Sequence, residues 1–340
     1  MKTKFRLCIF VFLSQITSFT LTSHVTALPE PGPTKLRPYK LDPEQITVSG
    51  VSSGGYMAVQ LQVAFSRIFA GSASVAGGVF WCSQGDSKKA QAECMGQASS
   101  VNVSDSIREA RRLESTGEID PLSNLRNKKV YIFASPKDTI INPVHSDKLS
   151  EFFAAFVESK NIQFEKTVQA AHGFPTLENG NPCDFAMLPW ILNCNFDLAG
   201  ELLRHLYGSL NPRQKAQPSN LLRFDQSDFG DAKTPLYKEG WIYVPSTCAN
   251  GSLCRLHIAL HGCQMNPDYI QDKFPTLGGY NEWAESNDII VLYPQSAKIQ
   301  KDNPYACWDW FGFTGKSYVT KNAPQMQAIV GMIKTLLGNP

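Results

Sequence analysis

Short apolar runs alternate along this chain with longer segments in which apolar residues recur at helical spacing. The runs have the length expected of buried strands, and they cover residues 46–49, 72–80, 129–134, 163–168, 256–260 and 288–294. Apolar positions three or four residues apart, typical of helices with one buried face, lie near residues 57–68, 147–159, 198–207 and 323–337. Strands alternating with helices predict an α/β fold, in which a mostly parallel sheet is covered by helices on both faces.

The same pattern favours a single domain after the N-terminal segment. Residues 28–44 are rich in proline and predict an extended lead-in, and the β-prone runs at residues 221–225 and 241–244 predict a hairpin. No internal repeat, low-complexity tract or linker is visible in the sequence. We therefore expect residues 28–340 to form one domain, a length that a large single domain can have.

Residues 1–27 have the features of a secretory signal peptide. Lys2, Lys4 and Arg6 precede an apolar run, and the small residues Val25 and Ala27 suit cleavage by signal peptidase. A membrane anchor is the alternative, but the apolar run is too short to span a bilayer. The sequence therefore predicts a secreted protein, located in the medium or in a periplasm.

The charge of the chain argues against polyanionic partners. Its formal net charge is +2, and residues 1–27 carry three basic residues and no acidic one, so the remainder has a net charge of −1. No basic surplus is left to hold nucleic acid or anionic lipid. We expect neither a nucleic-acid partner nor membrane association after the signal is removed.

The cysteines predict a disulfide framework. Of nine cysteines, Cys8 is removed with the signal peptide, so eight remain. An even number of cysteines in an exported chain favours disulfide bonds over free thiols. Three pairs of cysteines are close in sequence, which predicts the bonds Cys82–Cys94, Cys183–Cys194 and Cys248–Cys254. The two cysteines that remain predict the bond Cys263–Cys307. Metal binding is the alternative, but no Cys-x-x-Cys pair or His-rich cluster is present, so we predict no metal site.

A Gly-x-Ser-x-Gly motif at residues 50–54 lies between a β-prone run and a helical pattern. In a nucleophile elbow the glycines allow a tight turn that exposes the serine, and the N–H of the next residue can donate to an oxyanion. This frame centres on Ser52, which we predict to be the nucleophile, with Ser53 as the rival hydroxyl. The alternative is a glycine-rich turn with a purely structural role.

The acid and the base are expected in that order after the nucleophile, each in a loop that follows a strand. Asp138 lies in such a loop, whereas the rival Asp147 lies at the start of a predicted helix. His172 follows a strand in a loop of small residues. The other histidines after the signal lie in helices, in strands or in other motifs: His145, His205, His257 and His261. The sequence therefore predicts Asp138 and His172 as acid and base.

An oxyanion segment is present in an unusual place. His261–Gln264 follows a buried run and is similar to the loops that lend a second oxyanion amide in lipases and esterases, here the N–H of Cys263 beside that of Ser53. In the ordinary fold this loop precedes the nucleophile, but here it follows Ser52 by about two hundred residues. A circularly permuted α/β-hydrolase explains this order of motifs. In such a chain, residues 221–294 provide the first four strands of the ordinary sheet.

These features together resemble the poly(3-hydroxybutyrate) depolymerases of the single-domain, circularly permuted kind known from a fungus, over roughly residues 44–338. The matching segments are residues 48–57, the Asp138 loop and residues 172–175, 207–211, 259–263, 292–295 and 307–310. The resemblance implies Ser52, Asp138 and His172 as catalytic residues and the amides of Ser53 and Cys263 as the oxyanion hole. It also implies Trp308 as a substrate-binding residue of the crevice, with a core tryptophan as the alternative.

The resemblance implies a serine esterase that hydrolyses short-chain polyhydroxyalkanoates through an acyl-serine, as a monomer, with no metal or organic cofactor. The segment between Gln295 and Cys307 is more charged than in the fungal relative, with Lys298, Lys301 and Asp302 at the expected crevice rim. A feruloyl or acetyl esterase acting on polysaccharide is one alternative, because a fold does not fix a substrate. A non-catalytic surface-binding homologue is the other.

Overall fold

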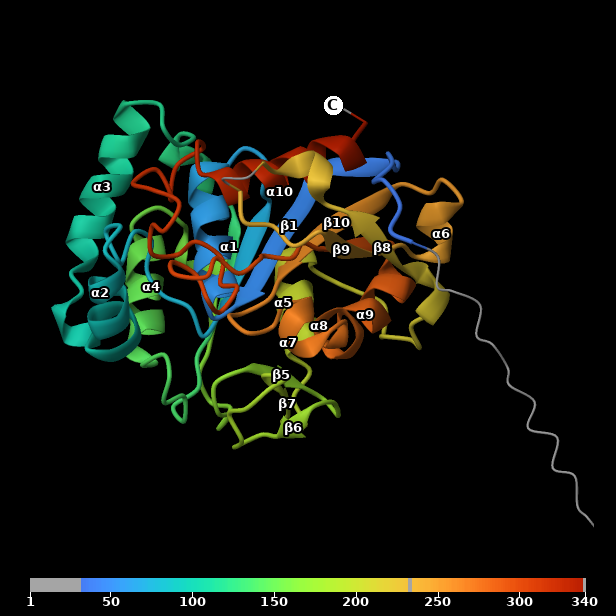
Figure 1. Ribbon diagram of the computed structural model, residues 1–340, viewed down its shortest axis with the longest axis horizontal. Coiled ribbons are helices and arrows are strands. Elements are labelled where there is room, and N and C mark those ends of the chain that lie inside the picture. The colour runs from blue at the N-terminus through green and yellow to red at the C-terminus, as the bar shows by residue number, and fades with distance from the viewer. Residues whose placement is uncertain (1–31, 232–233, 339–340) are drawn as a thin grey trace, which may run out of the picture. The chain divides into compact units, whose positions relative to one another are not determined.

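An eight-stranded sheet lies at the centre of residues 33–340, which group as one unit (Figure 1). The computed structural model describes residues 32–231 and 234–338, so the predicted signal peptide lies outside the described residues. The strand order is β4-β3-β2-β1-β10-β11-β9-β8. The strands are β1 (Leu41–Val51), β2 (Gly71–Val75), β3 (Lys129–Phe133), β4 (Ile162–Glu165), β8 (Leu221–Asp225), β9 (Glu239–Tyr243), β10 (Cys254–Leu260) and β11 (Ile289–Tyr293).

The sheet is mostly parallel. Strand β9 runs antiparallel to both β8 and β11, and the other neighbouring strands pair in parallel. The pair β8–β9 is the predicted hairpin at the edge of the sheet. Parallel strands that are buried on both faces carry near-continuous apolar runs. For this reason the apolar runs at residues 256–260 and 288–294 predicted β10 and β11 correctly.

Helices cover both faces of the sheet, as predicted. The longer helices are α1 (Ser53–Ala64), α3 (Val103–Ser115), α4 (Val144–Ala154), α5 (Leu198–Tyr207), α9 (Tyr280–Asn287) and α10 (Pro324–Leu336). The short ones are α2 (Ser87–Lys89), α6 (Ser246–Ala249), α7 (Pro267–Ile270), α8 (Lys273–Leu277) and the π-helix η1 (Ala90–Gly96). Among the described residues, none of the helices has the length and hydropathy needed to cross a bilayer.

Alternation along the strands divides the core into two layers. In β3, Val130 and Ile132 join the core under α1, α3, α4 and α10, whereas Tyr131 and Phe133 join the core under α5, α8 and α9. Successive side chains of a strand point to opposite faces, so each strand contributes to both layers. The two cores hold β1 and β10 in the middle of the sheet, where their carboxyl ends carry the candidate site.

The chain is circularly permuted, as the order of motifs predicts. Strands β1–β4 form one half of the sheet and β8–β11 the other, with β1 paired to β10 at the junction. The last described helix, α10, ends beside the residues that lead into β1, where the N–H of Tyr39 donates to the carbonyl of Leu336 at 2.9 Å. A chain joined at this point would run directly from α10 into β1, the strand that precedes Ser52.

Two predicted boundaries differ from the structure. Strand β2 ends at Val75 rather than near Phe80, because Ala76 has a positive φ of 48° that turns the chain. Strand β4 ends at Glu165 rather than at Val168. After β2 the apolar run continues into a buried loop, and a run of apolar residues alone does not tell a buried strand from a buried loop. After β4 the chain leaves the sheet at the polar, exposed residues Lys166 and Thr167.

A small second sheet, in the order β5-β7-β6, was not predicted. Its strands are β5 (Phe174–Thr176), β6 (Asn181–Pro182) and β7 (Ile191–Asn193), which are too short to produce an alternating pattern. The disulfide Cys183–Cys194 closes this sheet. Because β5 begins directly after Gly173, the small sheet supports the loop that carries His172.

The described residues contain four disulfide bonds, and each joins a pair that sequence spacing had grouped. They are Cys82–Cys94, Cys183–Cys194, Cys248–Cys254 and Cys263–Cys307. The first three close short loops of 6 to 12 residues, and the fourth spans 44 residues. This fourth bond ties the loop after β10 to the segment that precedes Trp308.

Candidate active site

Ser52 occupies a sharp turn between β1 and α1. Its φ is 56° and its ψ is −119°, a conformation that non-glycine residues rarely adopt, and its N–H donates to the carbonyl of Val75 at 2.8 Å. A Cβ on Gly50 would lie 2.2 Å from the carbonyl oxygen of Gly54, and one on Gly54 would lie 2.5 Å from two carbonyl oxygens of the neighbouring strand end. Both glycines are therefore required by the close approach of backbone to the turn.

The geometry favours Ser52 over Ser53 as the nucleophile. Both serines line one cavity, but Ser52 is partly exposed whereas the residue surface of Ser53 is only 2% exposed. The hydroxyl oxygen of Ser53 accepts the N–H of the buried Trp308 at 3.4 Å. Ser53 is the first residue of α1, so its own N–H has no carbonyl partner within the helix.

His172 and Asp138 form a buried hydrogen-bonded pair. The Nδ1 of His172 lies 2.7 Å from Oδ2 of Asp138, and each side chain is at most 6% exposed. The other carboxylate oxygen accepts the N–H groups of Ile140 and Ile141, each at 2.9 Å. These bonds fix the carboxylate, which in turn fixes the imidazole and leaves its Nε2 for a reaction partner. The rival Asp147 instead pairs with Lys166 on an exposed surface, at 3.2 Å.

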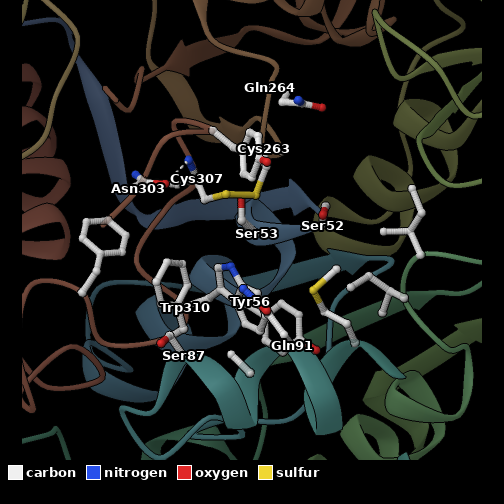
Figure 2. A pocket seen from close by; sticks show the side chains of 18 of the residues that line it. Ser52, Ser53, Tyr56, Ser87, Gln91, Cys263, Gln264, Asn303, Cys307 and Trp310 are labelled. Carbon is white, nitrogen blue, oxygen red and sulfur yellow. Dashed lines mark hydrogen bonds between the residues drawn. A yellow bond between two sulfur atoms is a disulfide. The ribbon is translucent and has the colours of Figure 1, made fainter. Parts of the chain in front are cut away.

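A cavity of about 750 Å³ brings Ser52 and His172 together. Figure 2 shows Ser53 between the Cys263–Cys307 disulfide and the rings of Tyr56 and Trp310, with Ser52 beside it. Most of the remaining lining is apolar, from Met95, Ile140, Ile141, Trp190, Met265, Tyr305, Phe311 and Phe313. Trp190 packs edge-on against His172, with ring centroids 6.1 Å apart. The arrangement can bind an apolar ester with its carbonyl at the serine.

The loop after β10 approaches the turn closely. A Cβ on Gly262 would lie 3.3 Å from the Cβ of Ser52, so a side chain there would crowd Ser52. Cys263 follows and lines the cavity. The two amides expected to form the oxyanion hole therefore belong to segments that meet at Ser52.

His261 holds the shape of this loop. Its Nε2 accepts the N–H of Ser296 at 3.1 Å, so Nδ1 carries the proton and donates to the carbonyl of Gly262 at 2.7 Å. Burial lowers the pKa of His261 to about 4, which keeps the ring neutral in this role. The histidine that the sequence placed in the oxyanion motif thus has a structural task rather than an acid–base one.

Trp308 does not line the cavity, contrary to the expectation. It is fully buried, and its ring packs against His261 with centroids 5.3 Å apart. The other tryptophan of the same motif, Trp310, lines the cavity and stacks on Tyr56 at 4.8 Å. Both tryptophans flank Asp309 in one short motif, so sequence alone offered no reason to prefer the second.

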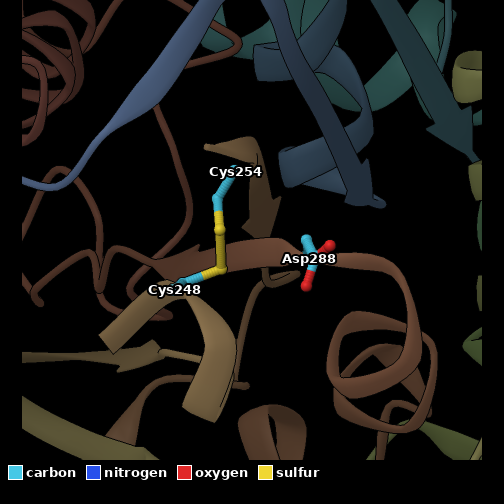
Figure 3. Close-up of side chains that lie close together, drawn as sticks. All are labelled: Cys248, Cys254 and Asp288. Carbon is cyan, nitrogen blue, oxygen red and sulfur yellow. A yellow bond between two sulfur atoms is a disulfide. The ribbon is translucent and has the colours of Figure 1, made fainter. Parts of the chain in front are cut away.

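The described residues contain one group of side chains close enough together to share a metal ion, Cys248, Cys254 and Asp288 (Figure 3). The two sulfur atoms are bonded to each other, and a metal-binding cysteine is a thiolate. Asp288 accepts the hydroxyl of Thr247 at 2.5 Å. In this oxidised form the group offers no set of metal ligands.

Comparison with known proteins places these features among esterases. The profile of the prolyl oligopeptidase family matches residues 37–195, the part that contains Ser52, Asp138 and His172. A poly(3-hydroxybutyrate) depolymerase of Delftia acidovorans is 41% identical over 86% of the chain, and a polyhydroxybutyrate depolymerase of Talaromyces funiculosus is 36% identical over 89%. The chain spans 60% of the length of the Delftia relative and 93% of the Talaromyces relative.

Solved structures agree with these sequence relatives. The crystal structure of a PHB depolymerase from Penicillium funiculosum matches with a TM-score of 0.84 and 35% identity, over 90% of this chain and 99% of the other. The same values hold for a PHB depolymerase solved as a complex with an R3HB trimer. The similarity therefore extends through both halves of the permuted sheet.

Proposed function

The chain belongs to the poly(3-hydroxybutyrate) depolymerase family, and on that premise we propose that it hydrolyses the ester bonds of short-chain polyhydroxyalkanoates, with poly(3-hydroxybutyrate) as the main substrate. The observation that carries the proposal is the buried Asp138–His172 pair at a cavity that also contains Ser52. This combination supplies an oriented base and an exposed hydroxyl in one apolar site.

The proposed reaction passes through an acyl-serine. Ser52 Oγ attacks the ester carbonyl while Nε2 of His172 takes its proton, and Asp138 stabilises the resulting imidazolium. The N–H groups of Ser53 and Cys263 hold the oxyanion. His172 then protonates the leaving alcohol, which is the carboxyl-terminal part of the polyester. Water, activated by the same histidine, releases the hydroxyl-terminal part as an acid.

The cavity lining supports a polyester substrate. A 3-hydroxybutyrate unit presents a methyl group and an ester but no charge, so it loses little hydration on entering an apolar site. The aromatic and aliphatic side chains around Ser52 provide such a site, with a limited number of polar groups to fix the ester. Lys301 and Asp302 also line the cavity, as the charged segment before Cys307 suggested.

We further propose that the enzyme acts outside the cytoplasm as a monomer with one catalytic domain. Four disulfide bonds support an oxidising compartment. The proposed catalytic and oxyanion residues and the residues that line the cavity all lie within one compact unit. Detection of the mature protein in the culture medium, beginning near residue 28, would test the location.

The decisive experiment compares the wild type with Ser52→Ala on a suspension of poly(3-hydroxybutyrate). We expect the wild type to release 3-hydroxybutyrate and its short oligomers, and the Ser52→Ala variant to lose at least about 10³-fold in rate, because the nucleophile is absent. A fluorophosphonate should label the wild type and the Ser53→Ala variant, which keeps the amide but lacks the rival hydroxyl.

Alternative substrates are tested in the same series. Release of ferulate or acetate from polysaccharide esters, without release of 3-hydroxybutyrate, would make the chain an esterase of another kind. Absence of any Ser52-dependent hydrolysis and of fluorophosphonate labelling would favour a non-catalytic binding protein.

A further inference from the structure

Asp309 is a buried carboxylate outside the proposed catalytic set. Its surface is 2% exposed, and Oδ1 accepts the N–H of Gly312 at 2.6 Å and that of Phe313 at 3.0 Å. Oδ2 accepts the N–H of Thr314 at 2.9 Å and also the hydroxyl of Thr314. Both oxygens of Asp309 are therefore held by the loop that follows it, and the loop amides are held by Asp309.

This loop, residues 310–314, carries one wall of the cavity. Trp310, Phe311 and Phe313 all line the space around Ser52. Their rings contact one another in sequence, with centroids 5.4 Å apart for Trp310 and Phe311 and 5.1 Å apart for Phe311 and Phe313. We call residues 310–314 the aromatic loop.

The backbone of Asp309 is anchored to two helices. Its carbonyl accepts Nε2 of Gln60 at 2.9 Å, and Gln60 lies on α1, the helix that begins after Ser52. Its N–H donates to Oε1 of Gln325 at 2.7 Å, and Gln325 lies in the first turn of α10. The position of Asp309 is thus fixed relative to the nucleophile helix, and the aromatic loop is fixed relative to Asp309.

We propose that Asp309 is a positioning residue that sets the aromatic wall for ester chains of several units, an inference that rests on the function proposed above. In Asp309→Asn the remaining oxygen can still accept the N–H groups of Gly312 and Phe313, but an NH₂ group then faces the N–H and the hydroxyl of Thr314. Buried donors without an acceptor are costly enough to drive rearrangement of the loop. Ser52, His172 and Asp138 keep their own hydrogen bonds in that case, so the wall changes and the catalytic set does not.

The test uses two substrates that differ in how much wall they contact. A trimer of 3-hydroxybutyrate needs the extended cavity, whereas p-nitrophenyl acetate needs little beyond Ser52 and the oxyanion amides. In Asp309→Asn we expect KM for the trimer to rise about tenfold, the equivalent of about 1.4 kcal/mol of binding. We expect kcat for p-nitrophenyl acetate to stay within about twofold of the wild type.

Hydrogen exchange reads the loop directly, without any substrate. Peptides that contain residues 310–314 should exchange faster in Asp309→Asn, whereas peptides from α1 should exchange as in the wild type. The matched control is Asp42→Asn at the far end of β1, which should change neither measurement. Thr314→Val removes one donor to the same carboxylate and should shift both measurements in the same direction by less.

The outcomes separate the two proposals. If the wild type does not cleave the trimer, the proposed function is wrong, and the inference that Asp309 positions a wall for ester chains is wrong as well. If the wild type cleaves the trimer and folded Asp309→Asn keeps its KM, the positioning role is wrong. Should Asp309→Asn fail to fold, Thr314→Val decides in its place, and an unchanged trimer KM with unchanged exchange of residues 310–314 overturns the inference.

Discussion

At the scale of single residues, the carboxylate of Asp138 is held in place by the backbone and can orient the imidazole of His172. One oxygen accepts two backbone N–H groups, from Ile140 and Ile141, and the other faces Nδ1 of His172. The backbone bonds determine which oxygen meets the imidazole. The proposed role of Asp138 therefore depends on the chemistry of the one atom that faces Nδ1 of His172.

Asp138→Asn tests this division. The amide oxygen can keep the two backbone bonds, which turns the NH₂ group toward His172 and favours the wrong imidazole tautomer. We expect kcat on a soluble ester to fall by roughly 10³- to 10⁴-fold with little loss of stability. The matched control is Asp147→Asn, the rival carboxylate on the surface, which should keep full activity. Equal losses in the two variants would contradict the assignment.

Three buried histidines should make the folded protein less stable at acid pH. Burial lowers the pKa of His257 to about 3 and those of His145 and His261 to about 4. The unfolded chain binds these protons below about pH 6.5, whereas the folded chain does not. Stability is therefore fully present above pH 6.5 and falls as the pH drops from there toward 4.

Denaturant unfolding between pH 7 and pH 4.5 measures this slope. Each histidine can contribute up to about 1.4 kcal/mol of unfolding free energy per pH unit. His145→Leu removes one of the three groups, and we expect the pH dependence to become shallower by about one proton. A slope equal to that of the wild type would show that His145 does not titrate in the unfolding reaction.

At the scale of elements, the disulfide Cys263–Cys307 joins the loop after β10, which carries the proposed oxyanion amide of Cys263, to the segment that leads to Asp309 and the aromatic loop. His261 makes a second connection, through Ser296, whose hydroxyl donates to the carbonyl of Cys307 at 2.8 Å. The loop that follows β10 and the wall of the cavity are thus held as one assembly.

The double variant Cys263→Ala/Cys307→Ala tests this link and keeps every backbone amide. Closing a loop of 44 residues is worth roughly 4 kcal/mol in the chain-entropy account, and the amide of residue 263 loses its support. We expect a large fall in unfolding free energy and about a tenfold fall in kcat. Cys248→Ala/Cys254→Ala, which opens a loop of 6 residues away from the cavity, should lose roughly half as much stability and retain activity.

At the scale of the whole molecule, a chain relinked to restore the ordinary order of the strands should still fold. The end of α10 and the lead-in to β1 are hydrogen bonded through Leu336 and Tyr39. Residues 208–217 between α5 and β8 are largely exposed, which suits new termini. We expect a chain that begins near residue 214, with residue 338 joined to residue 38 by a short glycine linker, to fold and to hydrolyse esters.

Thermal unfolding and ester hydrolysis by the relinked chain check this expectation. Some stability should be lost, because Thr34 pairs with β8 and would no longer precede β1. A relinked chain that folds but lacks activity would mean that the present order of the strands matters to the site itself. An uncut chain with the same linker length inserted after residue 338 serves as the control.

The sequence by itself determined the sheet, its two helical layers, the permutation and the positions of Ser52, Asp138 and His172. Buried parallel strands produce long apolar runs, and a strained turn such as that at Ser52 requires glycines at fixed spacing. Both features depend on residues that are neighbours in the sequence, so the sequence alone shows them. Closeness in the chain predicted three of the disulfide pairs, and elimination left Cys263–Cys307 as the fourth.

Only the tertiary structure decided which side chains line the cavity. Trp310 rather than Trp308 faces it, and the aromatic loop, Trp190 and Met95 join it from segments far apart in sequence. The small sheet that supports His172 was likewise absent from the pattern, because strands of two or three residues have no period. Which face a side chain presents depends on the backbone turn before it and on the partners opposite, and neither is encoded locally.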